Sequence, residues 1–294
     1  MASPADAPLL SSRSGRVKTA RRLARRATRA KDRLFLAEGP QVVGEALAAP
    51  GRVSEIFAVP SAATDHPGIF EAADAQEVVW HRVDDAALAS LAETVHPQGL
   101  VAVCRFLDRP FDDLLGSLMG DATGGGMTGG AATADGPDPI RLVAVCADAR
   151  DPGNAGTLLR CADAAGAGAV VLAGSSVDPY NGKAVRASAG SLFHLRLALH
   201  PDTAEVVTRL QGLGFSVLAA DGAGELDLDD AVDSGLLIRP TAWLFGNEAW
   251  GLPEELVELA DHRVAIPIHG KAESLNLATA AAVCLYASAR AQRR

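Results

Sequence analysis

Five polar residues follow short apolar or turn-forming segments, at positions where their side chains could do chemistry. Asn154 comes after an apolar run and Arg160 lies six positions further on, while Glu248, Ser274 and Asn276 follow further short runs near the C-terminus. Open α/β sheets hold their ligands outside the carboxyl ends of the strands. The pattern therefore predicts that the upstream pair and the C-terminal residues meet in one site.

Each of these residues also has a simpler role. Asn154 and Ser274 could cap the helices that follow them, and Glu248 could favour the N-terminus of the next helix. Arg160 could be an ordinary surface arginine near the middle of a helix. Taken singly, none of them indicates an enzyme. Only the combination of these residues indicates an enzyme.

The sequence lacks the motifs of several common enzyme classes. The run 166–171 has too few glycines for a dinucleotide fingerprint and follows a helix, and neither a P-loop nor a G-x-S-x-G nucleophile elbow occurs. A nucleotide-dependent α/β enzyme of another class is therefore disfavoured. The seven histidines show no metal-ligand spacing, so we expect no metal.

Length and composition favour two ordinary globular domains. The chain has 294 residues, of which 48% are hydrophobic and 21% charged, enough to bury a core built mainly from Val, Leu and Ala. The four cysteines form no C-x-x-C pair, which indicates free thiols in a reducing compartment. No apolar run is long enough to span a membrane. We expect a cytoplasmic protein; the Arg- and Ala-rich N-terminus leaves a mitochondrial transit peptide as the alternative.

Charge is unevenly distributed along the chain. Residues 1–33 hold ten basic and two acidic residues, so the formal net charge of −9 combines +8 in this segment with −17 in the rest. A basic arm on an acidic body indicates a polyanionic partner, although a solvated tail is the simpler alternative.

Residues 1–108 predict a small α/β domain that begins with a basic helix. In a helix over 17–31, five basic side chains would share one side and four apolar ones the other: Lys18, Arg21, Arg22, Arg25 and Arg29 against Ala20, Leu23, Ala24 and Ala27. Short strands are expected at 34–37, 54–59, 78–81 and 100–106, with helices from Pro40 and over 84–93.

Residues 109–139 change the character of the chain. Glycine clusters stand among Ala, Thr and Asp, with few large apolar residues. This composition predicts a flexible linker, without packed structure across about 116–138.

Residues 140–294 predict a second α/β domain with a parallel sheet. Strands are expected at 141–147, 169–173, 215–219, 241–245 and 263–268, mostly as continuous apolar runs, which is typical of strands covered on both faces. Helices are expected at about 154–165, 182–189, 202–212, 253–260 and 275–291. The last carries an apolar stripe along its length.

Three ordered motifs in this domain resemble those of the SpoU/TrmH-type RNA ribose 2′-O-methyltransferases of the SPOUT superfamily. They are Asp151-Pro152-Gly153-Asn154 with Arg160, Leu244-Phe245-Gly246-Asn247-Glu248, and Ile266-Pro267-Ile268 with Ser274-Leu275-Asn276-Leu277. The stretch 179–190 matches the middle of the family pattern. More weakly, Phe35–Gly39 and His96–Gly99 resemble a ribosomal-protein-L30e-like substrate-binding domain.

The resemblance implies a fold and a cofactor. The fold is a C-terminal parallel-sheet α/β domain with a deep trefoil knot plus a smaller N-terminal L30e-like α/β domain. The cofactor is S-adenosylmethionine, without a metal, held by backbone groups of five residues: Leu244, Gly246, Ile266, Leu275 and Asn276. A glycine at 246 suits a ligand lying against the backbone, because a Cβ there would occupy the ligand's space.

The resemblance also implies catalytic roles. Arg160 corresponds to the family's catalytic arginine; since arginine stays protonated, we expect it to lower the pKa of the ribose hydroxyl with a substrate phosphate rather than to act as a base. Asn154 would orient Arg160 or the ribose, while Glu248 and Ser274 would hold the RNA or the arginine.

The expected partners are RNA and a second copy of the chain, without DNA or a membrane. The preferred substrate is 23S rRNA, because an L30e-like domain suits folded RNA, and tRNA is the second choice. The basic segment would contact phosphates, and the C-terminal helix would contribute to a homodimer. A non-catalytic RNA-binding protein of the same fold is the alternative; the presence of all five polar residues argues against it.

Overall fold

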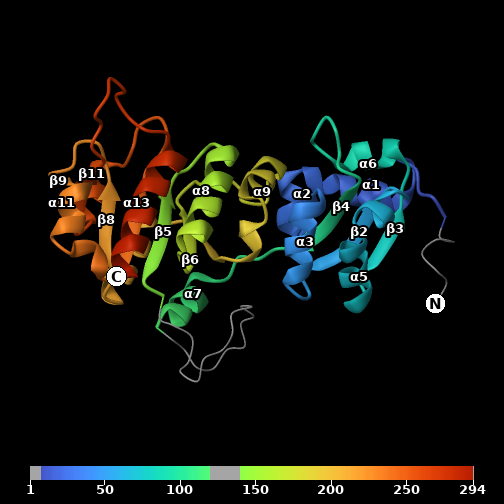
Figure 1. Ribbon diagram of the computed structural model, residues 1–294, viewed down its shortest axis with the longest axis horizontal. Helices are drawn as coiled ribbons and strands as arrows, with labels where there is room; N and C mark the ends of the chain where they lie inside the picture. The colour runs from blue at the N-terminus through green and yellow to red at the C-terminus, as the bar shows by residue number, and fades with distance from the viewer. Residues whose placement is uncertain (1–7, 120–139, 294) are drawn as a thin grey trace. The chain divides into compact units, whose positions relative to one another are not determined.

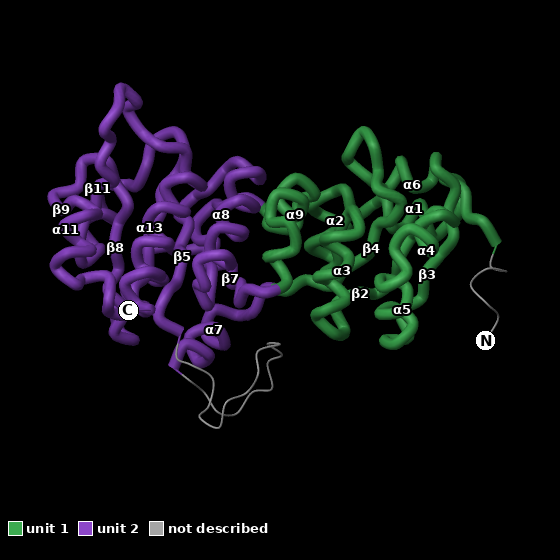
Figure 2. Tube along the Cα trace, viewed as in Figure 1, with its two compact units in different colours: residues 1–107, 178–193 green, residues 108–177, 194–294 purple. Residues whose placement is uncertain are grey.

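The computed structural model describes residues 8–119 and 140–293. These residues form two compact units (Figure 2). The N-terminal unit combines the described residues up to 107 with residues 178–193, and the C-terminal unit contains the described residues of 108–177 and those from 194 onward. The segment 178–193 therefore packs with the N-terminal unit, although the sequence places it within the stretch expected to form the C-terminal domain.

A four-stranded sheet forms the centre of the N-terminal unit, in the order β1-β4-β2-β3. Its pairs are antiparallel except for β2 with β3, which run parallel. The strands are β1 (Leu34–Glu38), β2 (Val53–Ala58), β3 (Val79–Arg82) and β4 (Leu100–Arg105). The helices around them include α3 (Pro40–Ala48), α4 (Ala62–Asp65), α5 (Pro67–Ala75) and α6 (Asp85–Leu91). All four predicted strands are present.

The predicted basic helix over 17–31 is wrong as a single helix. The chain forms α1 (Gly15–Arg21), the 3-10 turn η2 (Arg22–Ala24) and α2 (Arg26–Asp32), because Arg25 has extended backbone at φ −92° and ψ 128°. The break turns Ala24 and Ala27 to solvent, whereas Val17, Ala20 and Leu23 are buried.

One of the basic residues in this segment has a structural role. Arg29 is 3% exposed and donates from Nε and Nη2 to Asp178 Oδ2 at 3.0 and 2.7 Å, while its Nη1 donates to the carbonyl groups of Leu23 and Ala24. A guanidinium buried in this way is not available to a phosphate. The predicted basic face therefore loses Arg29, whereas Lys18, Arg21, Arg22 and Arg25 remain exposed.

Aromatic packing fixes the segment 178–193 within the N-terminal unit. Tyr180 is 1% exposed, stacks on Phe106 with ring centroids 3.8 Å apart, and lies 4.8 Å from the ring of Phe35. Its hydroxyl accepts a 2.7 Å hydrogen bond from the backbone N–H of Leu107. The segment contains α9 (Gly182–Ser188) and η3 (Ser191–Phe193). Its side chains thus complete the core of a unit far away in sequence.

A seven-stranded, wholly parallel sheet forms the C-terminal unit, in the order β7-β6-β5-β10-β8-β11-β9. The strands are β5 (Leu142–Ala147), β6 (Ala169–Ala173), β7 (Arg196–His200), β8 (Ser216–Ala220), β9 (Leu226–Asp227), β10 (Thr241–Phe245) and β11 (His262–Ala265). Every residue of β5, β6 and β10 is buried, as expected for strands covered on both faces. The sequence had not indicated β7 or the two-residue β9.

Helices cover both faces of this sheet. On one face α8 (Pro152–Ala165) packs against α13 (Leu277–Gln292), as Figure 1 shows, and α11 (Leu228–Asp233) lies beside α13. On the other face α10 (Thr203–Gly212) and α12 (Glu254–Leu259) enclose the main apolar core. A buried hydrogen bond joins α13 to the sheet: the indole N–H of Trp243 in β10 donates to the hydroxyl of Ser288 in α13 at 2.8 Å.

The predicted linker 109–139 is wrong at its beginning. Residues Phe111–Leu118 form α7, which presents four buried apolar side chains to the core under the sheet: Phe111, Leu114, Leu115 and Leu118. Their i, i+3, i+4, i+7 spacing is that of an amphipathic helix, a signal that the neighbouring glycine-rich stretch obscured. The remainder of the predicted linker, 120–139, lies outside the described residues. Within the described residues, no helix is long and apolar enough to cross a membrane.

Candidate active site

A cavity of about 590 Å³ lies in the C-terminal unit where strands β8, β10 and β11 end. Six of the residues singled out in the sequence line it: Gly246, Glu248, Ile266, Ser274, Leu275 and Asn276. The carboxyl ends of parallel strands meet at one edge of a sheet, which is why segments distant in sequence converge here.

A chain of hydrogen bonds joins the three predicted motifs. The side-chain amide of Asn154 donates to Glu248 Oε1 at 3.1 Å, and the amide of Asn276 donates to Asn154 Oδ1 at 3.0 Å. Asn276 Oδ1 also accepts from the backbone N–H of Ala278 and so caps α13. Asn154 is therefore held from both sides by residues about a hundred positions away.

Helix α8 begins with a different cap from the one considered in the sequence. Asp151, not Asn154, is the N-cap, and its Oδ1 accepts a 2.8 Å hydrogen bond from the backbone N–H of Asn154. Pro152 occupies the first turn, where its missing N–H costs nothing. Because the cap is Asp151, the amide of Asn154 is free to bond Glu248 and Asn276 instead.

Glu248 is the centre of this arrangement. Besides Asn154, its carboxylate accepts from the backbone N–H groups of Arg150 at 3.1 Å and Asp151 at 3.2 Å. Partial burial by itself would raise the pKa of Glu248, but its own backbone N–H, together with these donors, favours the ionised form and holds the pKa below the ordinary value. The carboxylate is thus charged at neutral pH and ties the loop after β5 to the loop after β10.

The loop after β10 closes tightly on itself. Asn247 and Gly251 exchange backbone hydrogen bonds of 2.9 Å, Gly251 has φ +71°, and the buried Asn247 amide donates to the carbonyl of Asp148 at 2.7 Å. A Cβ on Gly246 would lie 2.3 Å from the carbonyl carbon of Gly251. Glycine is therefore required at 246 by the protein's own backbone, which differs from the ligand-based reason expected from the sequence.

Arg160 and Ser274 stand apart from the hydrogen-bond chain. Both are exposed, and neither side chain has a hydrogen bond or ion pair to any residue in the part of the chain that the structure describes. Ser274 is also not a helix cap, since Asn276 fills that position. Arg160 lies on α8 six residues beyond Asn154, about 9 Å further along the helix axis. Both are unengaged groups that a substrate could contact.

Leu244 has a different environment from the other predicted cofactor residues. It is fully buried in β10 between β5 and β8, and its side chain belongs to the main core. It does not line the cavity. The other four, Gly246, Ile266, Leu275 and Asn276, do line it.

Several cavity residues were missed in the sequence. Asp221 and Gly222 directly follow β8, and Glu273 and Trp250 lie on the two loops already identified. Trp250 is 61% exposed, and the guanidinium of Arg150 lies 6.0 Å from its ring centroid. The rule that sites form at strand ends would have found Asp221, had the topology been known.

The side chains that line this cavity fit S-adenosylmethionine. Apolar side chains of Phe245, Ile266 and Leu275 offer contacts to an adenine, and the carboxylates of Glu248 and Glu273 line the same cavity and complement a cationic sulfonium. The third carboxylate, Asp221, is paired with Arg263 at 3.2 Å. The volume of the cavity lies within the range of small-molecule sites. Among residues 8–119 and 140–293, no group of three or more His, Cys, Asp or Glu could hold a metal ion.

Comparison with known proteins decides the family. Residues 141–286 match the model of the SpoU rRNA methylase family, and residues 15–102 match an MRM3-like substrate-binding domain. The chain is 32% identical over 279 residues to the 23S rRNA (guanosine(2553)-2′-O)-methyltransferase RlmP of Bacillus subtilis, covering 94% of this chain and 96% of the relative. The chain belongs to the SpoU rRNA methylase family.

Solved structures share the fold over almost the whole chain. An AdoMet-bound rRNA methyltransferase from Sinorhizobium meliloti matches with a TM-score of 0.76 and 28% identity, covering 97% of this chain and 98% of the other. The SpoU methyltransferase AviRb from Streptomyces viridochromogenes, also with AdoMet, matches with a TM-score of 0.75 and 26% identity, covering 95% and 99%. The predicted fold class, a SPOUT-type α/β domain preceded by a smaller α/β domain, is confirmed, as is the prediction of an RNA methyltransferase.

Proposed function

We propose that this protein transfers a methyl group from S-adenosylmethionine to a ribose 2′-hydroxyl of 23S rRNA, acting in the cytoplasm. The observation that carries the proposal is the hydrogen-bond chain from Glu248 through Asn154 to Asn276, which joins all three family motifs at one cavity. The relative that matches nearly the whole chain is named for this reaction on 23S rRNA. The four free cysteines, three of them buried, suit a reducing compartment.

Binding of the cofactor is assigned to the cavity at the ends of β8, β10 and β11. When bound, S-adenosylmethionine supplies an electrophilic methyl group. The tight loop 246–251 and the cap at Asn276 keep the walls of the cavity rigid, because each is fixed by short hydrogen bonds within the chain. Gly246, Ile266, Leu275 and Asn276 are the residues that we expect to contact the cofactor.

The ribose hydroxyl must lose its proton to become a strong nucleophile. A protonated arginine is a poor base, so we assign Arg160 an electrostatic role: with a substrate phosphate it lowers the pKa of the 2′-hydroxyl and stabilises the developing alkoxide. Its guanidinium is exposed and without a protein partner among the described residues, as this role requires. Asn154 would position the ribose, and Ser274, at the cavity wall, would contact the RNA.

The N-terminal unit would hold the RNA substrate. It matches a substrate-binding domain, and its segment 15–32 presents exposed cationic side chains at Lys18, Arg21, Arg22 and Arg25. Phosphate contacts by such residues give affinity that falls steeply with salt. The predicted 2′-hydroxyl requirement would restrict the substrate to RNA rather than DNA.

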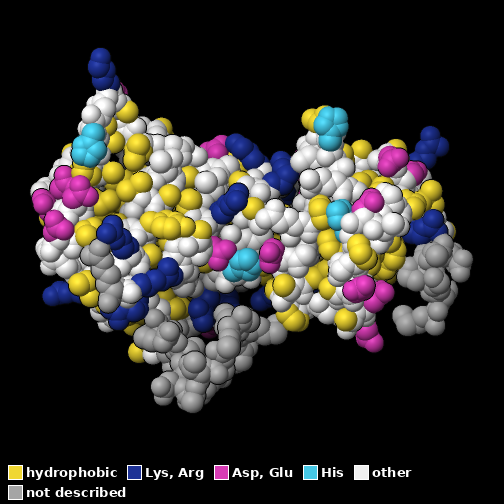
Figure 3. Space-filling view, in the orientation of Figure 1, with side chains coloured by type: hydrophobic (Ala, Val, Ile, Leu, Met, Phe, Trp, Pro, Cys, Tyr) yellow, Lys and Arg dark blue, Asp and Glu magenta, His cyan; other side chains and the backbone are white. Residues whose placement is uncertain are grey.

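We further propose that the chain forms a homodimer through α13. Figure 3 shows hydrophobic side chains gathered over this part of the C-terminal unit. On α13 itself Tyr286 is 53% and Val283 is 38% exposed, and a spacing of three residues places the two on the same side of the helix. Sedimentation equilibrium of the wild type and of Tyr286→Glu tests the assignment: a monomeric wild type would contradict it.

The proposed reaction is tested in two steps. Calorimetric titration with S-adenosylmethionine should show one site per chain. Incubation with cofactor carrying a labelled methyl group should then label 23S rRNA at a ribose 2′-oxygen, identified by nuclease digestion and mass spectrometry. Labelling of tRNA but not of 23S rRNA would show that tRNA is the substrate. Absence of both cofactor binding and labelling, with the fold intact and RNA present, would support a non-catalytic RNA-binding protein.

A further inference from the structure

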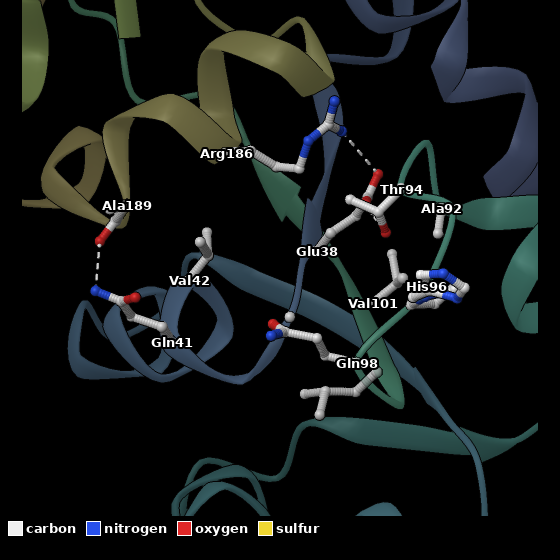
Figure 4. A pocket seen from close by; sticks show the side chains of 13 residues that line it. Glu38, Gln41, Val42, Ala92, Thr94, His96, Gln98, Val101, Arg186 and Ala189 are labelled. Atoms are coloured by element: carbon white, nitrogen blue, oxygen red, sulfur yellow. Dashed lines mark hydrogen bonds and ion pairs between the residues drawn. The ribbon is translucent and has the colours of Figure 1, made fainter. Parts of the chain in front are cut away.

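The N-terminal unit contains a cavity of its own, which is lined by different residues from those of the proposed active site. It has a volume of about 290 Å³ and lies where β1 ends, α3 begins and the loop 92–99 passes, with α9 forming one side (Figure 4). Its polar lining comes from Glu38, Gln41, Thr94, His96, Gln98 and Arg186. This size is close to the lower limit of small-molecule sites, so it suits one planar ring system rather than a long ligand.

A buried carboxylate is the main polar group of this cavity. The side chain of Glu38 is only 8% exposed, and Figure 4 shows it directed toward Arg186, which donates from Nη1 to Oε1 at 3.2 Å. Oε1 also accepts from the backbone N–H of Glu93 at 2.7 Å, while Oε2 accepts from the hydroxyl of Thr94 at 3.2 Å. An ionised carboxylate has about four acceptor positions, so these three donors leave one on Glu38 for a ligand.

The mouth of the cavity offers further groups for a planar, polar ligand. The side chains of Gln98 and His96 are exposed and make no hydrogen bond to any residue within 8–119 or 140–293. The amide nitrogen of Gln41 donates to the carbonyl of Ala189 at 3.3 Å, and its carbonyl oxygen accepts from no residue that the structure describes. A histidine ring can stack on a base, and a glutamine amide can both donate and accept.

The rest of the lining is apolar, and the charge balance disfavours an anion. Val42, Leu100 and Val101 are buried side chains at the cavity wall. Among the described residues that line the cavity, Arg186 is the only arginine or lysine, and it is already shared by two carboxylates, Glu38 and Glu93, each at 3.2 Å. A phosphate would face this excess of negative charge, whereas a neutral ring with an exocyclic amino group would donate a hydrogen bond to the remaining acceptor position of Glu38.

We propose that this cavity binds one unpaired nucleobase of the RNA substrate, and that Glu38 selects a base with an exocyclic amino group, namely guanine, adenine or cytosine. The amino group donates to Glu38, the ring packs between His96 and the apolar wall, and Gln98 bonds the ring edge. Uracil has no amino group, and its single ring N–H lies between two carbonyl oxygens that would face the Glu38 carboxylate, so uracil binds less tightly. The proposal rests on the proposed function only in taking RNA as the source of the base.

The experiment measures binding of labelled oligoribonucleotides to the full-length protein by fluorescence anisotropy. The probes are uridine heptamers, either all-uridine or with one central guanosine, adenosine or cytidine. At least one of the substituted probes should bind about tenfold more tightly than all-uridine, the range of one hydrogen bond to a charged group. Glu38→Gln and Gln98→Ala should bring the ratio close to one.

Control measurements separate this effect from loss of folding. Val95→Ala changes a side chain on the same loop that is 87% exposed and does not line the cavity, so this variant should keep the wild-type ratio. Gln98 has no described partner, so its removal should leave the thermal unfolding temperature unchanged even if Glu38→Gln lowers it. Equal binding of all four probes to the wild type, or a ratio unaffected in the Gln98 variant, overturns the proposal.

A further arm distinguishes RNA from free nucleotides. Guanosine, adenosine and cytidine monophosphates should compete only weakly with the heptamers; competition at equal concentration would assign the cavity to a free nucleotide and overturn the RNA source. Because the binding assay contains no cofactor, its result is independent of methyl transfer. Discrimination without methylation contradicts the proposed function alone, and methylation without discrimination contradicts this cavity's role alone.

Discussion

The side-chain amide of Asn154 donates a 3.1 Å hydrogen bond to the carboxylate of Glu248, although 94 residues separate the two. The same carboxylate accepts from two consecutive backbone N–H groups, those of Arg150 and Asp151. One side chain therefore fixes both the loop that precedes α8 and the polar residue Asn154 in the first turn of α8.

Replacing Glu248 by glutamine should disturb this arrangement more than it disturbs the fold. The new amide group faces N–H donors in place of one carboxylate oxygen, which leaves at least one donor unsatisfied. We expect the unfolding temperature to fall by about 2–4 °C and methyl transfer to fall by at least about tenfold, the effect of losing one charge-assisted contact. Differential scanning calorimetry and a labelled-methyl assay measure the two effects. Glu258→Gln, at an exposed glutamate without a described partner, should change neither.

The stabilisation from Glu248 should depend on pH in a defined direction. Because its pKa in the folded protein is lowered, its contribution is fully present above the unfolded pKa, near 4.5, and is lost as pH falls through the lower folded value. The difference in unfolding temperature between wild type and Glu248→Gln should therefore be constant from about pH 6 to 8 and shrink below about pH 4. A difference that grows on acidification would contradict this role.

Arg160→Ala should abolish methyl transfer and leave binding of S-adenosylmethionine nearly unchanged. The side chain is exposed and has no described protein partner, so its loss should not alter the unfolding temperature. Single-turnover methylation and calorimetric titration separate the two properties. Arg239→Ala, at an exposed arginine that follows η4 (Leu236–Ile238) and does not line the cavity, serves as the matched control and should retain activity. A wild-type rate of methylation in the Arg160 variant would contradict the proposed electrostatic role.

Reaction of the native protein with a thiol reagent should be confined to Cys161. Burial raises the pKa of Cys104, Cys146 and Cys284, which are inaccessible as well. Cys161 is partly exposed; burial raises its pKa and the neighbouring charge of Arg160 partly offsets that rise. Since the thiolate is the reactive form, Arg160→Ala should slow the labelling of Cys161. Mass spectrometry should find one label per native chain and four after unfolding.

Neutralising exposed basic residues of the N-terminal segment should reduce the salt dependence of RNA binding. Deleting residues 1–33 is a poor test, because Val17, Leu23 and Arg29 contribute to the core. The combined change of Lys18, Arg21 and Arg22 to glutamine retains the core and should reduce the slope of log K against log salt by up to about 2.

A matched control for the basic segment is Arg16→Gln. Its guanidinium is paired with Glu55 at 2.7 Å, so this change should alter the slope much less. An unchanged slope in the triple variant would show that these side chains do not contact phosphate.

The sequence by itself determined the elements with strong local signals. Strands such as β5, β6 and β10 are continuous apolar runs, and their burial on both faces follows directly from that composition. The family could be predicted because the three ordered motifs resemble those of the SpoU/TrmH-type methyltransferases. The helix α7 was not predicted, because its apolar residues at helical spacing stand next to a glycine-rich stretch that has the composition of a linker.

Only the tertiary structure decided which of these residues meet and why. Whether Arg29 faced solvent or Asp178 depended on a partner 149 positions away, and no periodicity within 17–31 contains that information. The same holds for Glu248, whose three donors in other residues come from the loop after β5 and the first turn of α8, and for Gly246, whose missing Cβ leaves room for the backbone of Gly251. Local sequence sets the propensity of each element, but contacts between distant residues depend on how the sheet orders its strands, and that order is a property of the whole fold.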